Sequence, residues 1–187
     1  MSQKRVPAIF MRGGSSKGVF FHSSDLPEDK NKWNEIFLSV LGSPDPYGRQ
    51  LNGMGGGISS LSKAVVIGPP TRPDADVDYT FAQISVQNSV VDYSSNCGNL
   101  SSAVGPFAID TGLVDASATE REVRIHNTNS RKLIVSRVPI RAGLSEVVGD
   151  FSIPGVSGTG AKIQLDFLDP GGTRTGRLLP TGNTIDT

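Results

Sequence analysis

The chain has 187 residues, and its 18 basic and 18 acidic side chains give a formal net charge of zero at pH 7. This balance argues against nucleic acid or an anionic membrane surface as a partner, so a charged small molecule would have to be recognised by a few placed groups. The single cysteine cannot form an intramolecular disulfide, and the apolar stretches are far shorter than the roughly 20 residues that span a bilayer. Because a signal-peptide pattern is also absent, we expect one globular unit in the reducing cytoplasm.

Glycine and proline are frequent, at 22 and 12 residues, which is typical of a β-rich protein with many tight turns. In chain order, the pattern predicts a strand at residues 6–11, a polar and basic loop at 12–18, and a second strand directly after it. A helix is predicted to begin at 26–29, because Pro27 suits the first turn of a helix, and to end at Gly42.

A glycine-rich turn at 53–60 leads into a predicted strand at 61–67, and further strands are predicted at 79–86 and 89–93. Lys63 lies in the first of these strands among mostly apolar residues. A half-buried Lys63 would lose hydration, and its pKa would fall toward the range of a base that works near neutral pH. Alternatively, Lys63 points from an edge strand into water, and the residues alone leave both interpretations open.

The only cysteine, Cys97, lies where a polar turn meets a helix predicted at 99–110, which Gly112 would end. Unpaired backbone N–H groups and the helix dipole favour an anion at this position, so the thiol is a candidate acid–base group or nucleophile. The alternative is that Cys97 is a small buried hydrophobe. Small residues along one side of the helix would permit close packing inside a barrel.

The last third of the chain alternates apolar and polar residues at 122–127, 132–139 and 162–167, as half-buried antiparallel strands do. The tail at 169–187 shows little apolar periodicity. We therefore assign residues 1–168 to one folded unit and 169–187 to a linker toward a further segment.

Three polar turns, at 13–18, 56–60 and 95–99, offer backbone N–H groups and short hydroxyl or amide side chains, from which carboxylate-binding sites are built. None of them has the spacing of a phosphate-binding loop or of a dinucleotide-binding fingerprint. His22 and His126 are far apart, with no cysteine or paired carboxylate at ligand spacing, so we expect no metal site. Lysine and cysteine remain as the candidate proton-transfer groups.

Six segments, in order along the chain, resemble the 2-methylaconitate cis-trans isomerase family, which includes methylitaconate isomerases and oxalomesaconate tautomerases. These segments are MRGGSSKG at 11–18, GSPDPYG at 42–48, NGMGG at 52–56, SLSK at 60–63, NCGNL at 96–100 and LLPTGN at 178–183. The resemblance implies the α+β, diaminopimelate-epimerase-like fold, in which a β-barrel-like sheet wraps around a central helix. The chain would form the first of the family's two halves, and the active site would lie in the cleft between the halves.

The resemblance also implies an isomerase, independent of cofactors and metals, that shifts a proton and a double bond in an unsaturated di- or tricarboxylate such as 2-methylaconitate, as in propionate catabolism through the 2-methylcitrate cycle. By their positions in the matching segments, Lys63 is the proton-abstracting base and Cys97 a second acid–base or polarising group, and which acts first stays open. The residues expected to bind substrate carboxylates are Ser15, Ser16, Lys17, Ser59, Ser60, Asn96, Gly98 and Asn99.

Two other classes of function are alternatives to the isomerase. A half-length chain could be a non-catalytic accessory module that partners a dehydratase, but such a module would be expected to lack the pair Lys63 and Cys97. A cysteine-based racemase would need a second cysteine opposite Cys97, and the chain has only one. For the isomerase, we expect the partner to be either a second copy of the chain or the missing second half.

Overall fold

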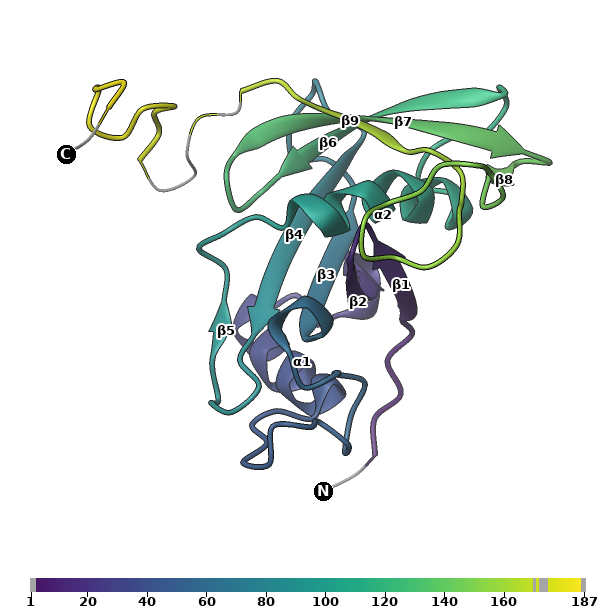
Figure 1. The fold of residues 1–187 in the computed structure, drawn as a ribbon. Coiled ribbons are helices and arrows are strands. Elements are labelled where there is room, and N and C mark those ends of the chain that lie inside the picture. The colour runs from purple at the N-terminus through teal and green to yellow at the C-terminus, as the bar shows by residue number, and fades with distance from the viewer. Residues whose placement is uncertain (1–2, 170, 172–174, 186–187) are drawn as a thin grey trace.

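The computed structural model describes residues 3–169, 171 and 175–185, and these residues form one curled sheet around a central helix (Figure 1). Neighbouring strands are antiparallel, except that β2 runs parallel to β3 and β4 to β6. The strand order is β1 (Ile9–Gly13), β2 (Ser16–His22), β3 (Lys63–Gly68), β4 (Val77–Ile84), β6 (Glu120–Asn127), β7 (Lys132–Arg141) and β8 (Leu144–Ser145), with β5 (Val91–Asp92) paired to β4 and β9 (Gln164–Phe167) paired to β7.

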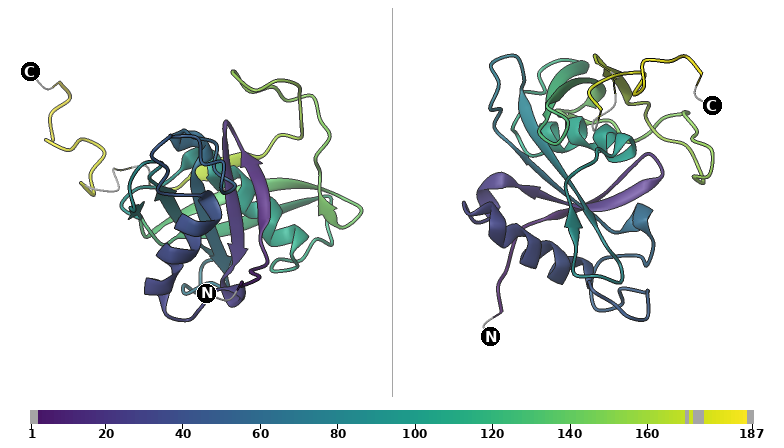
Figure 2. Two further views of the ribbon diagram at one scale, coloured as in Figure 1. Left: turned by 90° about the horizontal axis from the view of Figure 1, so that it is seen from below. Right: turned by 90° about the vertical axis from the view of Figure 1, so that its left-hand side faces the viewer.

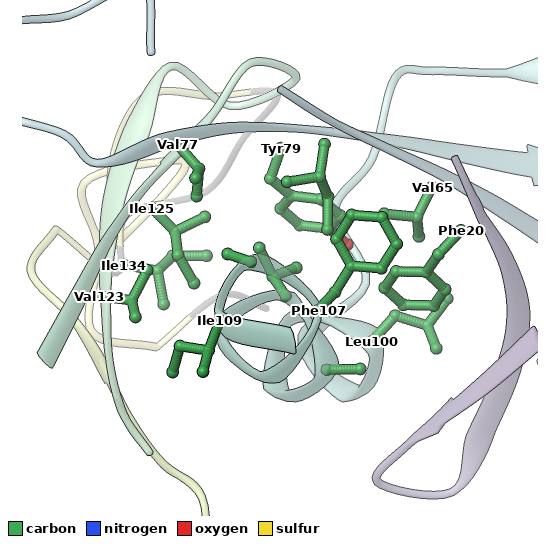
Figure 3. Packing of buried hydrophobic residues seen from close by; sticks show 14 of the residues in the cluster. Phe20, Val65, Val77, Tyr79, Leu100, Phe107, Ile109, Val123, Ile125 and Ile134 are labelled. Carbon is green, nitrogen blue, oxygen red and sulfur yellow. The ribbon is translucent and has the colours of Figure 1, made fainter. Parts of the chain in front are cut away.

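The central helix α2 (Gly98–Asp110) lies against the concave face of this sheet, and strands from β2 to β7 contribute the apolar side chains that surround it (Figure 3). Phe107 of the helix packs on Phe20 of β2, with 5.8 Å between ring centroids. Gly105 faces β7 so closely that a Cβ atom there would lie 2.7 Å from a methyl of Val138. The sheet can therefore wrap tightly around the helix because the helix carries small residues on that side.

The second helix, α1 (Trp33–Leu41), covers the opposite face of the β2–β4 region (Figure 2). Side chains alternate between the two faces along each strand. On β2, Phe20 enters the cluster around α2, whereas Val19 and Phe21 enter the cluster under α1. Phe21 stacks on Phe37 of α1 at 5.4 Å between centroids. This alternation decides which polar residues of the strands reach the N-terminal end of α2.

The first hairpin differs from the sequence-based expectation of a loop at 12–18, which is wrong. Strand β1 continues to Gly13 and β2 starts at Ser16, so the two residues between them form the whole turn. Gly14 permits this tight turn because it adopts a φ of +51°, which is unfavourable for residues with a Cβ atom.

Helix α1 begins at Trp33, so the predicted helix start at 26–29 is also wrong. Pro27 lies outside the helix, where its carbonyl accepts a hydrogen bond of 2.8 Å from the indole nitrogen of Trp33. The side chain of Asp29 instead caps a short 3-10 turn that precedes the helix. The predicted end at Gly42 is confirmed, because this residue adopts φ +73° and its N–H bonds to the last carbonyls of the helix.

Most of the remaining elements are confirmed with small shifts of their ends. Helix α2 matches the helix predicted at 99–110, and the strands predicted at 61–67 and 79–86 correspond to β3 and β4. The strands of the last third are antiparallel neighbours, as predicted. The strand predicted at 89–93 is reduced to the two residues of β5. After β9 the described residues form no further helix or strand. Part of the tail, at 170, 172–174 and 186–187, lies outside the described residues, and its assignment as a linker stays a prediction.

Candidate active site

Cys97 is the N-cap residue of α2, as its position in the sequence predicted. Its Sγ accepts a hydrogen bond of 3.5 Å from the backbone N–H of Leu100, and its side chain is 8% exposed. A Cβ atom at the next residue, Gly98, would meet no other atom within 4 Å, so the helix end is open on that side. The first N–H groups of a helix have no partner within the helix, and they lie here beside the thiol.

Lys63 is the first residue of β3, and its amine lies just below the surface on the α2 face of the sheet. β3 lies between β2 and β4, so the interpretation of Lys63 as an outward residue of an edge strand is wrong. The residue is 8% exposed, and its Nζ donates a hydrogen bond of 2.5 Å to Oε1 of Gln83. The same atom lies 5.1 Å from the ring centroid of Phe81, within range of a cation–π interaction.

A short series of contacts links Lys63 to Cys97. Gly18 of β2 lies between Lys63 and α2, because a Cβ atom at Gly18 would be 3.3 Å from Cβ of Lys63 and 3.0 Å from a methyl of Leu100. Leu100 in turn donates its N–H to the sulfur of Cys97. Lys63 and Cys97 therefore lie on the same face of the sheet, near the N-terminal end of α2, and not on opposite outer surfaces.

The electrostatics of this region favour a neutral lysine more than water does. Burial lowers the pKa of Lys63 below its ordinary value of 10.5, and the charge of Cys97 acts in the opposite direction with a smaller effect. Tyr79 donates its hydroxyl to the carbonyl of Cys97 at 3.4 Å, and burial raises the pKa of Tyr79. Tyr79 is therefore a neutral donor below the cluster.

The β1–β2 turn packs directly on the first turn of α2. A Cβ atom at Gly13 would lie 2.5 Å from the carbonyl oxygen of Asn99, and one at Gly14 would lie 2.3 Å from its Oδ1. The backbone N–H of Ser15 points at the same Oδ1, at 3.4 Å. Ser16, 3% exposed, begins β2 directly after this turn. The structure thus brings Ser15, Ser16 and Asn99 to the helix end that carries Cys97.

The second predicted serine turn is the short 3-10 helix Ser59–Leu61, which directly precedes β3. Nε2 of Gln83 donates to the carbonyls of Ser59 and Ser62, at 3.1 Å and 2.9 Å, while Oε1 of Gln83 accepts from Lys63. The turn is therefore connected to the amine through one amide side chain. Ser59 is exposed and Ser60 half-buried.

Two of the residues predicted to bind substrate carboxylates, Lys17 and Asn96, face away from Lys63 or bond to another residue. Lys17 shares the face of β2 that points toward α1, and its Nζ lies 5.9 Å from the ring centroid of Phe10, so the structure does not bring it to Lys63. Oδ1 of Asn96 accepts a hydrogen bond of 2.7 Å from Asn127, which attaches the turn before α2 to the end of β6.

Two glutamines, Gln83 and the buried Gln50, were not predicted as functional residues from the sequence. Gln50 is fully buried and donates to the hydroxyls of Ser43 and Ser62, at 2.8 Å and 2.7 Å. Neither glutamine belongs to a recognisable motif. Gln83 could have been found only from the β3–β4 register, which pairs it with Lys63.

Among the described residues, no group of three or more His, Cys, Asp or Glu side chains could hold a metal ion. His126 forms a partly buried pair with Asp78, at 2.8 Å between Nδ1 and Oδ1. Within the same part of the chain, no helix has the length and apolar character needed to cross a bilayer.

A sheet that curls around a central helix, with a cysteine at the N-terminus of that helix, defines the chain as one half of a diaminopimelate-epimerase-like fold. The crystal structure of a methylitaconate-delta-isomerase matches 98% of the chain, with a TM-score of 0.90 and 49% identity, and the match covers 47% of the isomerase's own length. A structure described as a probable proline racemase of Agrobacterium radiobacter matches 75% of the chain and covers 40% of its own length, with a TM-score of 0.50 and 15% identity, which shows a shared fold alone.

The chain belongs to the family described as PrpF protein, which it matches over residues 3–187. It is 49% identical to the 3-methylitaconate isomerase of Eubacterium barkeri, over 98% of the chain and 48% of that protein. It is 47% identical to the 2-methyl-aconitate isomerase of Cupriavidus necator (98% and 49% covered) and 46% identical to the 4-oxalomesaconate tautomerase of Pseudomonas putida (100% and 51% covered). The chain therefore spans about half the length of the curated relatives it matches.

Proposed function

We propose that the chain supplies one half of the active site of an isomerase that moves a proton and a double bond in an unsaturated di- or tricarboxylate, without a cofactor. The observation that carries this proposal is the placement of the Lys63 amine and the Cys97 thiol on one face of the sheet, at the open N-terminal end of α2. The names of the relatives support the reaction class, and 2-methylaconitate is the substrate we propose first.

In this reaction, neutral Lys63 removes a proton from a carbon next to the double bond of the substrate. The C–H electron pair spreads over the double bond and its carboxylate, and the proton stays on Nζ. Backbone N–H groups of Gly98 and Asn99 stabilise the added negative charge, because helix N-termini favour anions. The Cys97 thiol then gives a proton to the far carbon, and transfer of the proton from Nζ to the thiolate, directly or through water, restores the neutral amine and the thiol.

The helix end is open beside Gly98, so the proposed cleft needs a second wall. We propose that this wall is the second half of the fold or, in its place, another copy of the chain. The proposed role of Cys97 also requires a reduced thiol, which fits the cytoplasm.

The test is the ultraviolet absorbance of 2-methylaconitate after addition of the chain, alone and co-expressed with the remaining half of the Eubacterium barkeri relative. We expect turnover that falls by at least about 100-fold in Lys63→Ala, the usual range for loss of a general base. Lys32→Ala removes an exposed lysine directly before α1, the helix on the opposite face of the sheet, and is the matched control. Absence of turnover in both preparations, with methylitaconate and oxalomesaconate also tried, would instead favour the accessory module that partners a dehydratase.

A further inference from the structure

Gln83 lies directly opposite Lys63 in the antiparallel β3–β4 pair. Its Oε1 accepts the hydrogen bond of 2.5 Å from Nζ of Lys63. The nitrogen of the same amide donates to the carbonyl of Ser62 at 2.9 Å and to that of Ser59 at 3.1 Å. One side chain therefore connects the amine to both ends of the short turn that precedes β3.

These hydrogen bonds determine which way the Gln83 amide faces. Backbone carbonyls only accept hydrogen bonds, so they require the NH₂ side of the amide, and the lysine amine then meets the oxygen. A rotated amide would set its oxygen against two carbonyl oxygens and its NH₂ against the amine. The oxygen beside Nζ is consequently held in one place.

The groups that anchor Gln83 are themselves held by the buried network below the turn. Ser62 is fully buried, its hydroxyl donates to the carbonyl of Ile84 at 3.0 Å, and it accepts a hydrogen bond of 2.7 Å from Gln50. Satisfied buried networks of this kind are rigid. The amide of Gln83 therefore has a fixed support, as a residue that orients another group requires.

Among the described residues, the groups that face Lys63 from the elements packed against it carry no formal charge, and one of them is a thiol, which can ionise. They are Gly18 of β2, Phe81 and Gln83 of β4, and Leu100 and Cys97 of α2. A neutral amide can orient the amine without adding a negative charge, whereas a carboxylate at the same position would hold a proton on the amine.

On the basis of the proposed function, we propose that Gln83 is the positioning residue of the base, which holds the Lys63 amine toward the N-terminal end of α2 and connects it to the turn Ser59–Leu61. Gln83 exchanges no proton itself. Its oxygen accepts one N–H of Nζ and the ring of Phe81 covers another side, which limits the directions in which the lone pair of the neutral amine can point.

Competitive labelling of the folded chain with acetic anhydride across a range of pH, read by peptide mass spectrometry, tests the contact without requiring activity. Gln83→Glu places a carboxylate beside Nζ, so we expect the pKa of Lys63 to rise and its labelling at a fixed pH below the midpoint to fall by roughly tenfold. Gln87→Glu makes the same change of charge on an exposed turn and should leave Lys63 unchanged. Equal labelling of Lys63 in the two variants would overturn the proposal.

Gln83→Met keeps the length of the side chain but removes both hydrogen-bonding groups. In the active assembly we expect Gln83→Met to lower kcat with little change in KM. We expect Gln83→Glu to move the acid limb of the pH–rate profile to higher pH, in step with the midpoint of Lys63 labelling. A kcat unaffected by Gln83→Met would contradict the positioning role. If the midpoint of Lys63 labelling shifts but the pH–rate profile does not, the contact between Gln83 and the amine is supported. The same result would show that Lys63 is not the base.

Discussion

Lys63 is the one buried lysine of the described residues, and its side chain contacts an amide, an aromatic ring and a glycine. Gly18 is the most restrictive of them, since a Cβ atom there would also lie 3.0 Å from the carbonyl oxygen of Lys63 itself. The hydrogen atom of Gly18 thus leaves room for the lysine stem beside Leu100. Burial without a carboxylate partner is what lowers the pKa of Lys63.

This burial predicts a pH-dependent stability. Because the folded state disfavours the charged amine, the free energy of unfolding should rise as pH increases from the lowered pKa of Lys63 toward the ordinary value of 10.5. Lys63→Met lacks this titration, so its advantage over the unchanged chain should be largest near neutral pH and should shrink as the pH rises toward 10.5. Urea unfolding of both proteins at several pH values measures the difference, and a difference that is constant over this range would contradict the account.

Cys97 became a candidate through its local pattern, a polar turn that meets a helix, whereas the role of Lys63 was assigned from the resemblance of its segment to the isomerase family. The position of Cys97 at a helix N-terminus followed from local pattern alone, and its location is confirmed. The burial of Lys63 could not be settled in this way, because burial depends on which strands flank β3. Gln83 was missed for the same reason, since its partner is 20 residues away along the chain.

At the scale of elements, α2 contacts most of the curled sheet, and its small residues set how closely the strands approach. Ser136 and Val138 of β7 both lie within 2.8 Å of the Cβ position of Gly105. The N-terminal end of the same helix is open beside Gly98. One helix therefore has a packed middle and a free end, which leaves its first turn available for a ligand.

Gly105→Ala should destabilise the chain even though alanine favours helices. The new methyl group has no space against β7, and such overpacking costs about 1–3 kcal/mol. Gly98→Ala, in the same helix, meets no atom within 4 Å and should change the free energy of unfolding by less than about 1 kcal/mol. Thermal unfolding followed by circular dichroism compares them, and equal melting temperatures would show that β7 does not approach the helix so closely.

Gly14→Ala tests the packing of the β1–β2 turn on α2. The residue has φ +51°, which alone costs about 1–2 kcal/mol for alanine, and its Cβ atom would displace the side chain of Asn99. Gly112→Ala is the control, because it has φ +76° with open space around it. We expect Gly14→Ala to be the more destabilising of the two by about 1 kcal/mol, from the lost hydrogen bond of Ser15 to Asn99. A smaller effect for Gly14→Ala than for Gly112→Ala would contradict this packing.

At the scale of the whole molecule, the described chain is one curled sheet with a helix inside and a helix outside. Large apolar side chains lie exposed in two loops, among them Tyr47, Leu51, Val147 and Val148. Apolar residues exposed together indicate contact surfaces. The alternation of strands and the central helix were predictable from local pattern, whereas the parallel pairs β2–β3 and β4–β6 depend on long connections that no local pattern specifies.

If a second wall must complete the cleft at the N-terminal end of α2, the chain should associate in solution. Light scattering coupled to gel filtration should give a mass above the 19.7 kDa of one chain at micromolar concentration, and co-expression with the second half of a relative should replace this self-association with a one-to-one complex. If the chain is monomeric alone and also forms no complex with the co-expressed half, the open helix end needs no partner.

The proposed function requires that the amine of Lys63 and the thiol of Cys97 share one site. o-Phthalaldehyde joins an amine and a thiol that lie close together into a fluorescent isoindole, and Cys97 is the only cysteine in the chain. Without added thiol, we predict a fluorescent product in which peptide mapping links Cys97 to Lys63, and which Lys63→Arg abolishes. A product that joins Cys97 to a different lysine, or no product while the thiol remains titratable, would contradict the shared site.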